Sequence, residues 1–221
     1  MRCPICEGRE VSRFYRTQFS ATPYFYRCNA CGYCFVWPRP ERSYSEQQGD
    51  ATDAHKNEVL SWDYYSKIHN FLPQKGRFRF LEVGASTGYF SKLIEDRCDA
   101  EVISIEMDVK AACYAETRLD LVVYAEPFES FRSDQSFDVI FSGHVIEHVF
   151  DRFEYLRKCS DLLSEKGVLI FLTPNADAWK QIMLHDEWGG VPNGDTHNFF
   201  QENQLLIFWR NWGWPLVPMR R

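Results

Sequence analysis

Four cysteines near the start place the strongest constraint on how the first forty residues fold. Cys3 and Cys6 form one Cys-x-x-Cys pair, and Cys28 and Cys31 form a second pair after 21 intervening residues. Two such pairs at the ends of a short hairpin can close a tetrahedral shell around one zinc ion, which stabilises a segment too small to bury its own core. The spacing therefore predicts a structural zinc site with these four ligands, in a zinc ribbon over residues 1–40.

The composition indicates an ordinary globular protein. The chain has 221 residues, of which 45% are hydrophobic and 25% charged, enough for one large domain and a small appendage. Its formal net charge of −6 disfavours binding to nucleic acid, without excluding a local basic patch. The start lacks the apolar region of a secretory signal, and no apolar run approaches the roughly 18 residues of a membrane span. We therefore expect a cytoplasmic protein that does not contact membranes.

The rest of the chain alternates between strand and helix patterns. Residues 41–75 are predicted to be a polar linker followed by a bridging helix, because apolar residues recur there at helical spacing until Pro73. The expected strands after Gly76 are residues 78–83, 101–106, 120–124, 137–142 and 168–172, and the expected helices are residues 88–96, 108–117 and 151–163. Such alternation predicts an α/β domain over residues 76–221, with a doubly wound, mostly parallel, Rossmann-like sheet.

A glycine turn follows the first of these strands. Gly84 permits a tight turn, Gly88 permits close backbone approach, and the helix that follows offers free N–H groups to a polar ligand. Glu106 ends the next strand, where a carboxylate can accept hydrogen bonds from both hydroxyls of a ribose. Together these features predict an adenosine-containing ligand. The loop lacks the G-x-G-x-x-G spacing of nicotinamide-dependent oxidoreductases, which disfavours that class.

Longer motifs resemble a known family. Residues 81–90, Leu-Glu-Val-Gly-Ala-Ser-Thr-Gly-Tyr-Phe, are similar to the first motif of class I S-adenosylmethionine-dependent methyltransferases. Residues 137–149 resemble the fourth-strand motif of the same class, and residues 173–175 and 197–206 resemble the methyltransferase type 23 branch. In several members of that branch a zinc ribbon precedes the catalytic domain. The resemblance thus covers nearly the whole chain and implies two cofactors, S-adenosylmethionine and a structural zinc.

The resemblance also implies which residues bind the cofactor. These positions lie at the ends of strands or in the turns after them: Glu82, Gly84, Ala85, Gly88, Glu106, Met107, Glu126, Ser142 and Gly143. Glu106 would hold the ribose and Met107 would pack against the adenine, with Glu126 or its neighbour Phe128 nearby. Ser86 stands where many members have glycine, and we expect it to fit if its φ is negative.

Two histidines are the candidates for handling a proton. His144 is implied to lie beside the sulfonium, and His197 stands in a polar loop where it could accept a proton from the acceptor or tie the loop to Asn175. Residues 144–148 also spell H-x-x-E-H, a pattern of zinc peptidases. We reject a metal site there, because His144 is expected in the turn after a strand rather than inside a helix.

These observations predict an enzyme that transfers a methyl group from S-adenosylmethionine to a small-molecule acceptor, with a sugar or secondary metabolite favoured. Positioning supplies most of the catalysis in such a displacement, because the departing sulfur becomes neutral. Two alternatives stay open. One is a non-catalytic docking protein that keeps the cofactor fold, and the other is an RNA methyltransferase that docks its substrate on the ribbon.

The end of the chain departs from the family pattern. Methyltransferases of this class normally add two strands after the fifth, whereas the sequence here leaves room for one short strand at most, weakened by Pro215 and Pro218. We therefore expect a C-terminally shortened sheet. The fifth strand would be exposed, covered by residues 176–200, or completed by a second copy of the chain in a homodimer.

Overall fold

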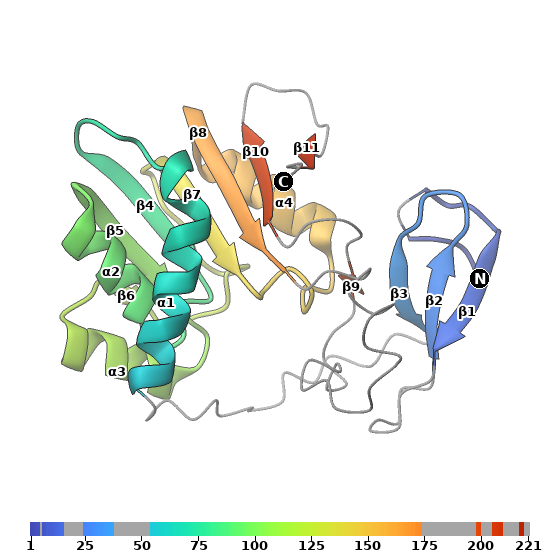
Figure 1. Ribbon diagram of the computed structural model, residues 1–221, viewed down its shortest axis with the longest axis horizontal. Coiled ribbons are helices and arrows are strands. Elements are labelled where there is room, and N and C mark those ends of the chain that lie inside the picture. The colour runs from blue at the N-terminus through green and yellow to red at the C-terminus, as the bar shows by residue number, and fades with distance from the viewer. Residues whose placement is uncertain are drawn as a thin grey trace.

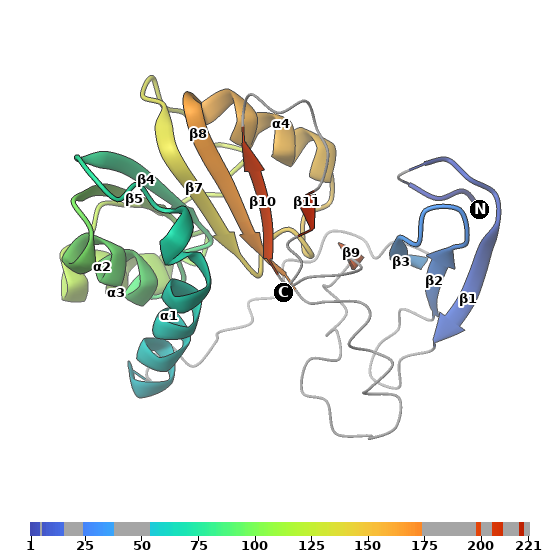
Figure 2. The ribbon, with the colours of Figure 1, turned by 45° about the horizontal axis from the view of Figure 1, so that its top comes forward.

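The structure, a computed structural model, describes residues 1–4, 6–15, 24–37, 54–173, 198–199, 205–209 and 217–218. Two separate sheets organise them (Figure 1). The smaller sheet is antiparallel and lies at one end of the molecule in both views of the ribbon (Figures 1 and 2). Its strands are β1 (Val11–Tyr15), β2 (Tyr24–Cys28), β3 (Cys34–Trp37) and β9 (Asn198–Phe199). The ribbon sheet therefore takes its last strand from the far end of the sequence.

The larger sheet has seven strands in the order β11-β10-β8-β7-β4-β5-β6, and the five strands from β8 to β6 form four parallel pairs. The parallel strands are β4 (Phe78–Val83), β5 (Ala100–Ile105), β6 (Val123–Tyr124), β7 (Phe137–Gly143) and β8 (Leu163–Leu172). The helices between them are α2 (Tyr89–Arg97), α3 (Val109–Leu119) and α4 (Arg152–Leu162). This arrangement confirms the predicted Rossmann-like, mostly parallel fold. The strand β8 begins five residues earlier than expected, because Leu163 pairs with Phe137.

Each face of this sheet buries its own apolar core. On β8, Val168 and Ile170 belong to a cluster with Ile94 of α2, whereas Leu169 and Phe171 belong to a cluster with Tyr155 of α4. Side chains alternate between the two faces of a strand, so an uninterrupted apolar run is what a strand covered on both sides requires. Helices therefore cover both faces, as the doubly wound prediction demands.

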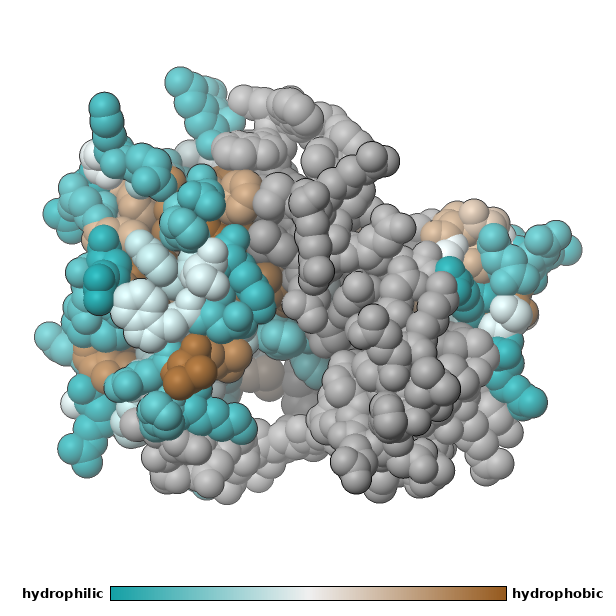
Figure 3. Space-filling model, in the orientation of Figure 1, coloured by the Kyte–Doolittle hydropathy of each residue, from teal (hydrophilic) through white to brown (hydrophobic). Residues whose placement is uncertain are grey.

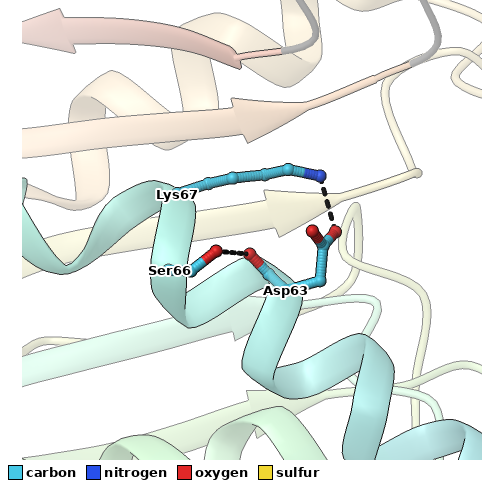
Figure 4. Close-up of polar contacts among 3 residues, drawn as sticks. All are labelled: Asp63, Ser66 and Lys67. Atoms are coloured by element: carbon cyan, nitrogen blue, oxygen red, sulfur yellow. Dashed lines mark hydrogen bonds and ion pairs between the residues drawn. The ribbon is translucent and has the colours of Figure 1, made fainter.

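The bridging helix α1 (Ala54–Ile68) and a short 3₁₀ turn, η1 (His69–Phe71), precede β4, and α1 packs against α2. The outer side of α1 is polar near its end: Lys67 Nζ lies 2.5 Å from Asp63 Oδ2, and the Ser66 hydroxyl donates to the Asp63 carbonyl (Figure 4). On the face of the molecule that is toward the viewer in Figure 1, hydrophobic patches lie among hydrophilic side chains of the described residues (Figure 3). The exposed apolar residues of α1 include Val59 and Trp62, and the Arg97 guanidinium stacks over the Trp62 ring.

The prediction of a shortened sheet is wrong. Two further strands, β10 (Leu205–Trp209) and β11 (Val217–Pro218), follow β8, and β10 pairs antiparallel with the whole of residues 168–172. Five consecutive apolar residues suit a strand beside a buried neighbour. Pro218 is compatible with β11 because that strand lies at the edge of the sheet. The fifth strand therefore needs no second copy of the chain to cover it, which removes the structural reason for expecting a homodimer.

Candidate functional site

A cavity of about 480 Å³ lies where the strands β4, β5 and β7 end, and α1 closes one side of it. In open parallel sheets, ligands bind at this carboxyl edge. Most of the predicted cofactor positions line the cavity, namely Glu82, Gly84, Ala85, Glu106, Met107, Glu126 and Gly143, together with the catalytic candidate His144. The structure thus brings these residues to one place, although they come from four separate stretches of the chain.

The turn after β4 follows a left-handed path that explains its glycines. Gly84 has a φ of 78°, and a Cβ atom there would lie 2.4 Å from a methyl group of Val145. Ser86 has a φ of 49°, so the condition of a negative φ, under which a serine was expected to fit this turn, is not met. A positive φ favours glycine, which accounts for the glycine that many family members carry here. In this chain a serine adopts that conformation, and its backbone N–H is held by Glu106 at 2.6 Å.

Gly88 has a different role from the one predicted. It precedes α2 with a φ of 80°, and a Cβ atom there would lie 2.7 Å from both Ala115 Cβ and Leu121 Cδ1. Gly88 lies outside the cavity lining, and the close approach that it permits is to α3 rather than to a ligand.

We expect the change Gly88→Ala to destabilise the fold more than the matched change Gly76→Ala. Both glycines have a φ of 80°, but a Cβ atom at Gly76 meets nothing within 4 Å. Gly76→Ala should cost about 1 kcal/mol for the left-handed backbone, and Gly88→Ala about 1–3 kcal/mol more for overpacking. Urea unfolding of both variants measures the difference, and equal losses would contradict the packing role of Gly88.

Glu106 lies just past the end of β5 and faces the glycine turn. Its Oε2 atom accepts a hydrogen bond from Ser86 N at 2.6 Å, and its Oε1 atom accepts one from Asp108 N at 2.8 Å. The side chain of Asp108 in turn caps α3 by accepting from Lys110 N and Ala111 N. These bonds fix the carboxylate at the rim of the cavity, in a position suited to accepting bonds from a ribose.

Glu82 is buried beneath the turn, with 4% of its surface exposed. Its carboxyl accepts a hydrogen bond from Ser91 Oγ at 2.5 Å, and Ser91 Oγ lies 2.7 Å from Ser104 Oγ. Burial raises the pKa of Glu82 to about 8, because removal from water disfavours the charged form and the nearby Glu106 charge adds to that effect. Glu82 is therefore mostly protonated near neutral pH in the absence of a cationic ligand.

This raised pKa gives a test of stability against pH. Between its ordinary pKa of 4.5 and about 8, the folded protein binds the Glu82 proton more tightly than the unfolded chain does, so stability falls as the pH rises through this window. The variant Glu82→Gln lacks the ionisation. As the pH rises, the free energy of unfolding of this variant should therefore increase relative to that of the unchanged protein, by up to about 1.4 kcal/mol per pH unit. Chemical unfolding at pH 5, 6.5 and 8 tests this, and a pH-independent difference would contradict it.

His144 lies in the turn after β7, as predicted, with a φ of 55°. Its backbone N–H donates to the Leu172 carbonyl at 2.7 Å, and its side chain is 48% exposed. Ser142 is placed differently from the prediction: its side chain is fully buried, outside the cavity lining, with its hydroxyl 2.9 Å from that of Tyr155. Ser142 therefore supports the wall of the cavity from behind. The second catalytic candidate, His197, lies outside the described residues.

Helix α1 contributes residues to the cavity that no sequence motif indicated. Asn57, Leu60, Ser61 and Tyr64 of this helix line the cavity, and Asn57 Nδ2 donates to Thr87 Oγ1 at 3.2 Å. Tyr64 stacks on His144 with the ring centroids 6.0 Å apart. Helical spacing of Val59 and Trp62 predicted the helix, but the structure leaves these two side chains exposed and turns a different face of α1 toward the cavity.

The four predicted zinc ligands converge in the ribbon. All four sulfur atoms lie within 4.8 Å of one another, with Cys3–Cys31 and Cys6–Cys28 distances of 3.6 Å. A tetrahedron with Zn–S bonds of about 2.3 Å has S···S edges of about 3.8 Å, so the set fits one zinc ion. The two knuckles have the same kind of backbone turn. Glu7 N donates to the Cys3 carbonyl and Gly32 N donates to the Cys28 carbonyl, and both Glu7 and Gly32 have a positive φ. Among the described residues this is the one such cluster.

Arg152 joins the ribbon to the larger domain. It is the first residue of α4 and only 4% exposed. Its Nη2 atom donates to the Pro4 carbonyl at 2.6 Å, inside the first knuckle, and its guanidinium lies 4.9 Å from the ring centroid of Tyr33, just after the second. One side chain therefore contacts both halves of the cysteine site.

Comparison with known proteins identifies the family. A family model described as a methyltransferase domain matches residues 54–218, which is most of the chain. The chain belongs to this methyltransferase family. The match begins at α1 and ends at β11, so the ribbon precedes it.

Curated relatives of this methyltransferase family member match different fractions of its length. A probable S-adenosylmethionine-dependent methyltransferase of Mycobacterium tuberculosis is 35% identical over 98 residues, 43% of this chain and 35% of the relative, so the chain spans about a third of that protein's length in the match. The ubiquinone biosynthesis O-methyltransferase of Histophilus somni is 28% identical over 185 residues, which is 76% of each chain.

Solved structures share the methyltransferase fold. The plantazolicin methyltransferase BpumL, in complex with a triazolic desmethylPZN analog and SAH, superposes with a TM-score of 0.51 at 15% identity, over 63% of this chain and 55% of that one. At this identity the similarity establishes the fold. Within the described ranges, the helices of this family member are all too short or too polar to cross a membrane.

Proposed function

We propose that this chain binds S-adenosylmethionine in the cavity and transfers its methyl group to a small-molecule acceptor. The observation that carries the proposal is the pairing of Glu106 with the 84–88 turn in a chain of the methyltransferase family. On cofactor binding, the hydrogen bonds that Glu106 accepts from Ser86 N and Asp108 N would be replaced in part by hydrogen bonds from the two hydroxyls of the ribose. Glu82, Gly84 and Ala85 would surround the methionine part of the cofactor, and Met107 and Glu126 would lie near the adenine.

The charges around the cavity indicate what kind of acceptor it takes. Besides the buried Glu82, three glutamates line it, Glu106, Glu126 and Glu129, whereas no lysine or arginine does so within the described part of the chain. Residues 174–197 have one lysine and four acidic residues, so they add no net positive charge. Such surroundings repel phosphates and carboxylates. We infer an uncharged or cationic acceptor, such as an unphosphorylated sugar or another secondary metabolite, and disfavour RNA.

The named substrates of related proteins agree with a small acceptor. The relatives include a ubiquinone biosynthesis O-methyltransferase, and the similar solved structure is a plantazolicin methyltransferase. We further propose that the ribbon holds one structural zinc ion through Cys3, Cys6, Cys28 and Cys31. Its role there is to close two knuckles that lack a core of their own, apart from the small cluster around Tyr33 and Phe35.

The experiment that tests this function is turnover. The purified protein is incubated with S-adenosylmethionine and matched acceptors that share a skeleton and differ in charge, tyramine, p-cresol and 4-hydroxyphenylacetate, alongside neutral and amino sugars and a transfer RNA. Formation of S-adenosylhomocysteine is measured by mass spectrometry. The proposal expects turnover with a neutral or cationic acceptor and none with the RNA. Preference for RNA or for anionic acceptors would contradict it, and tight cofactor binding without turnover on any acceptor would favour the non-catalytic docking protein.

A further inference from the structure

His144 has a buried carboxylate behind it. The Nδ1 atom of His144 lies 3.3 Å from Glu147 Oε1, while the His144 ring lines the cavity and is half exposed. Glu147 itself is outside the cavity lining and only 2% exposed. The pair therefore consists of a ring that a ligand can reach and a carboxylate that it cannot.

Glu147 is held in place from the other side. Its Oε2 atom accepts a hydrogen bond from Thr173 Oγ1 at 3.0 Å, and Thr173, which follows β8, is 1% exposed. A buried carboxylate is costly unless it is paired and hydrogen-bonded, so a site that retains one has a use for it. The two oxygens of Glu147 divide their contacts, one toward Thr173 and the other toward His144.

The position of His144 is fixed independently of Glu147. Its backbone has a φ of 55°, which is costly for a residue with a side chain, and its N–H is tied to the Leu172 carbonyl. Tyr64 of α1 stacks on the face of the ring, with the ring centroids 6.0 Å apart. The titratable groups in contact with the imidazole are Glu147 on its own turn and Tyr64 on α1, and Glu82 on β4 and His148 line the same cavity. Strain of this kind at a cavity wall is typical of sites where the orientation of a side chain matters.

We propose that Glu147 is a positioning residue that holds the imidazole of His144 with Nδ1–H toward its carboxylate, which leaves Nε2 as the base that faces the acceptor. This inference rests on the proposed methyl transfer. Which nitrogen of a histidine carries the proton is set by the partner of the other nitrogen. A neutral imidazole with its proton on Nδ1 has its lone pair on Nε2, the atom that points away from Glu147.

This arrangement provides an acceptor for the proton that is released when a methyl group is transferred to a hydroxyl. As the acceptor oxygen forms its bond to the methyl carbon, the carbon–sulfur bond breaks and its electron pair returns to sulfur, which becomes a neutral thioether. The hydroxyl proton passes to Nε2 of His144. The resulting imidazolium is stabilised by the Glu147 carboxylate at Nδ1, as an orienting carboxylate does for a catalytic histidine.

The test is the position of the proton on His144, read by long-range ¹H–¹⁵N correlation spectra of protein labelled in its histidines. Spectra are recorded at alkaline pH, where imidazoles are neutral, and the His144 signals are assigned by their loss in His144→Gln. In the unchanged protein we expect Nδ1 to carry the proton. In Glu147→Leu, which removes the acceptor, we expect the proton to redistribute between the two nitrogens. Glu147→Gln retains an oxygen acceptor and should keep the Nδ1–H form.

Controls separate this role from mere support of the fold. The variant Glu154→Leu removes an exposed carboxylate of α4 and should leave the His144 signals unchanged. If Glu147→Leu fails to fold, Thr173→Val loosens the same carboxylate by removing its hydroxyl partner, and should shift the proton distribution partway. In every folded variant, the affinity for S-adenosylmethionine should stay within about twofold of that of the unchanged protein, because Glu147 does not line the cavity.

Two results would overturn the inference. One is an unchanged protein whose His144 carries its proton on Nε2, and the other is a folded Glu147→Leu with the proton still on Nδ1. Neither outcome depends on turnover. Absence of cofactor binding would instead count against the proposed function, with the proton position still measurable.

Discussion

Replacement of Glu106 by alanine is expected to weaken S-adenosylmethionine binding by about 2 kcal/mol, or roughly 30-fold in the dissociation constant. The change removes the carboxylate that would accept bonds from both ribose hydroxyls. It also leaves Ser86 N and Asp108 N without the acceptor that shapes the turn. Isothermal titration calorimetry measures the loss directly.

Two variants sharpen this prediction. Glu101→Ala removes an exposed carboxylate from β5 outside the cavity and should leave the affinity unchanged. Glu106→Gln keeps the shape of the side chain and one acceptor oxygen, so its affinity should fall between those of the unchanged protein and the alanine variant. Equal affinities for Glu106→Ala and Glu101→Ala would contradict the assignment of Glu106 to the ribose.

The second large effect concerns the ribbon. We expect the purified protein to contain about one zinc ion per chain, and Cys28→Ser to lose it. Cys28 belongs to the second knuckle and is fully buried. The small core of the ribbon, around Tyr33 and Phe35, cannot replace the stabilisation that the metal supplies. Binding of a structural zinc supplies about 10–16 kcal/mol in zinc-finger peptides, so the ribbon should unfold in this variant. Elemental analysis and thermal unfolding report the two effects.

Loss of the metal should also release the contact of Arg152 with Pro4 and Tyr33, because Pro4 lies inside the first knuckle and Tyr33 follows the second directly. Limited proteolysis should then cleave Cys28→Ser near its start while the larger domain persists. Cys113→Ser changes an exposed cysteine outside the four-sulfur cluster and should keep its zinc. A metal-free protein with a cooperatively folded ribbon would show that the ribbon does not require zinc.

Much of the fold could be predicted because its signals are local. The apolar runs of β7 and β8, the glycine turn and the carboxylate of Glu106 each depend on a few neighbouring residues and on the order of elements in a parallel sheet. The convergence of the four cysteines could be predicted for the same reason, because the spacing of metal ligands can be read directly from the sequence. These predictions needed no knowledge of what packs against what.

The features that were missed depend on contacts between distant segments. Leu205–Trp209 was not recognised as a strand because a short apolar run cannot be assigned by periodicity alone, and pairing with β8 decides it. The same holds for Tyr64 against His144, and for Thr173 against Glu147. At Ser86 the condition of a negative φ fails for a structural reason: the hydrogen bond that its backbone N–H donates to Glu106, together with the turn around it, holds the serine at a positive φ.

A calorimetric titration of the unchanged protein with S-adenosylmethionine tests the central claim most directly. The cavity that Glu106, the 84–88 turn and α1 enclose predicts saturable binding of one cofactor molecule per chain. Absence of binding by protein that circular dichroism shows to be folded would contradict the assignment of this cavity to S-adenosylmethionine.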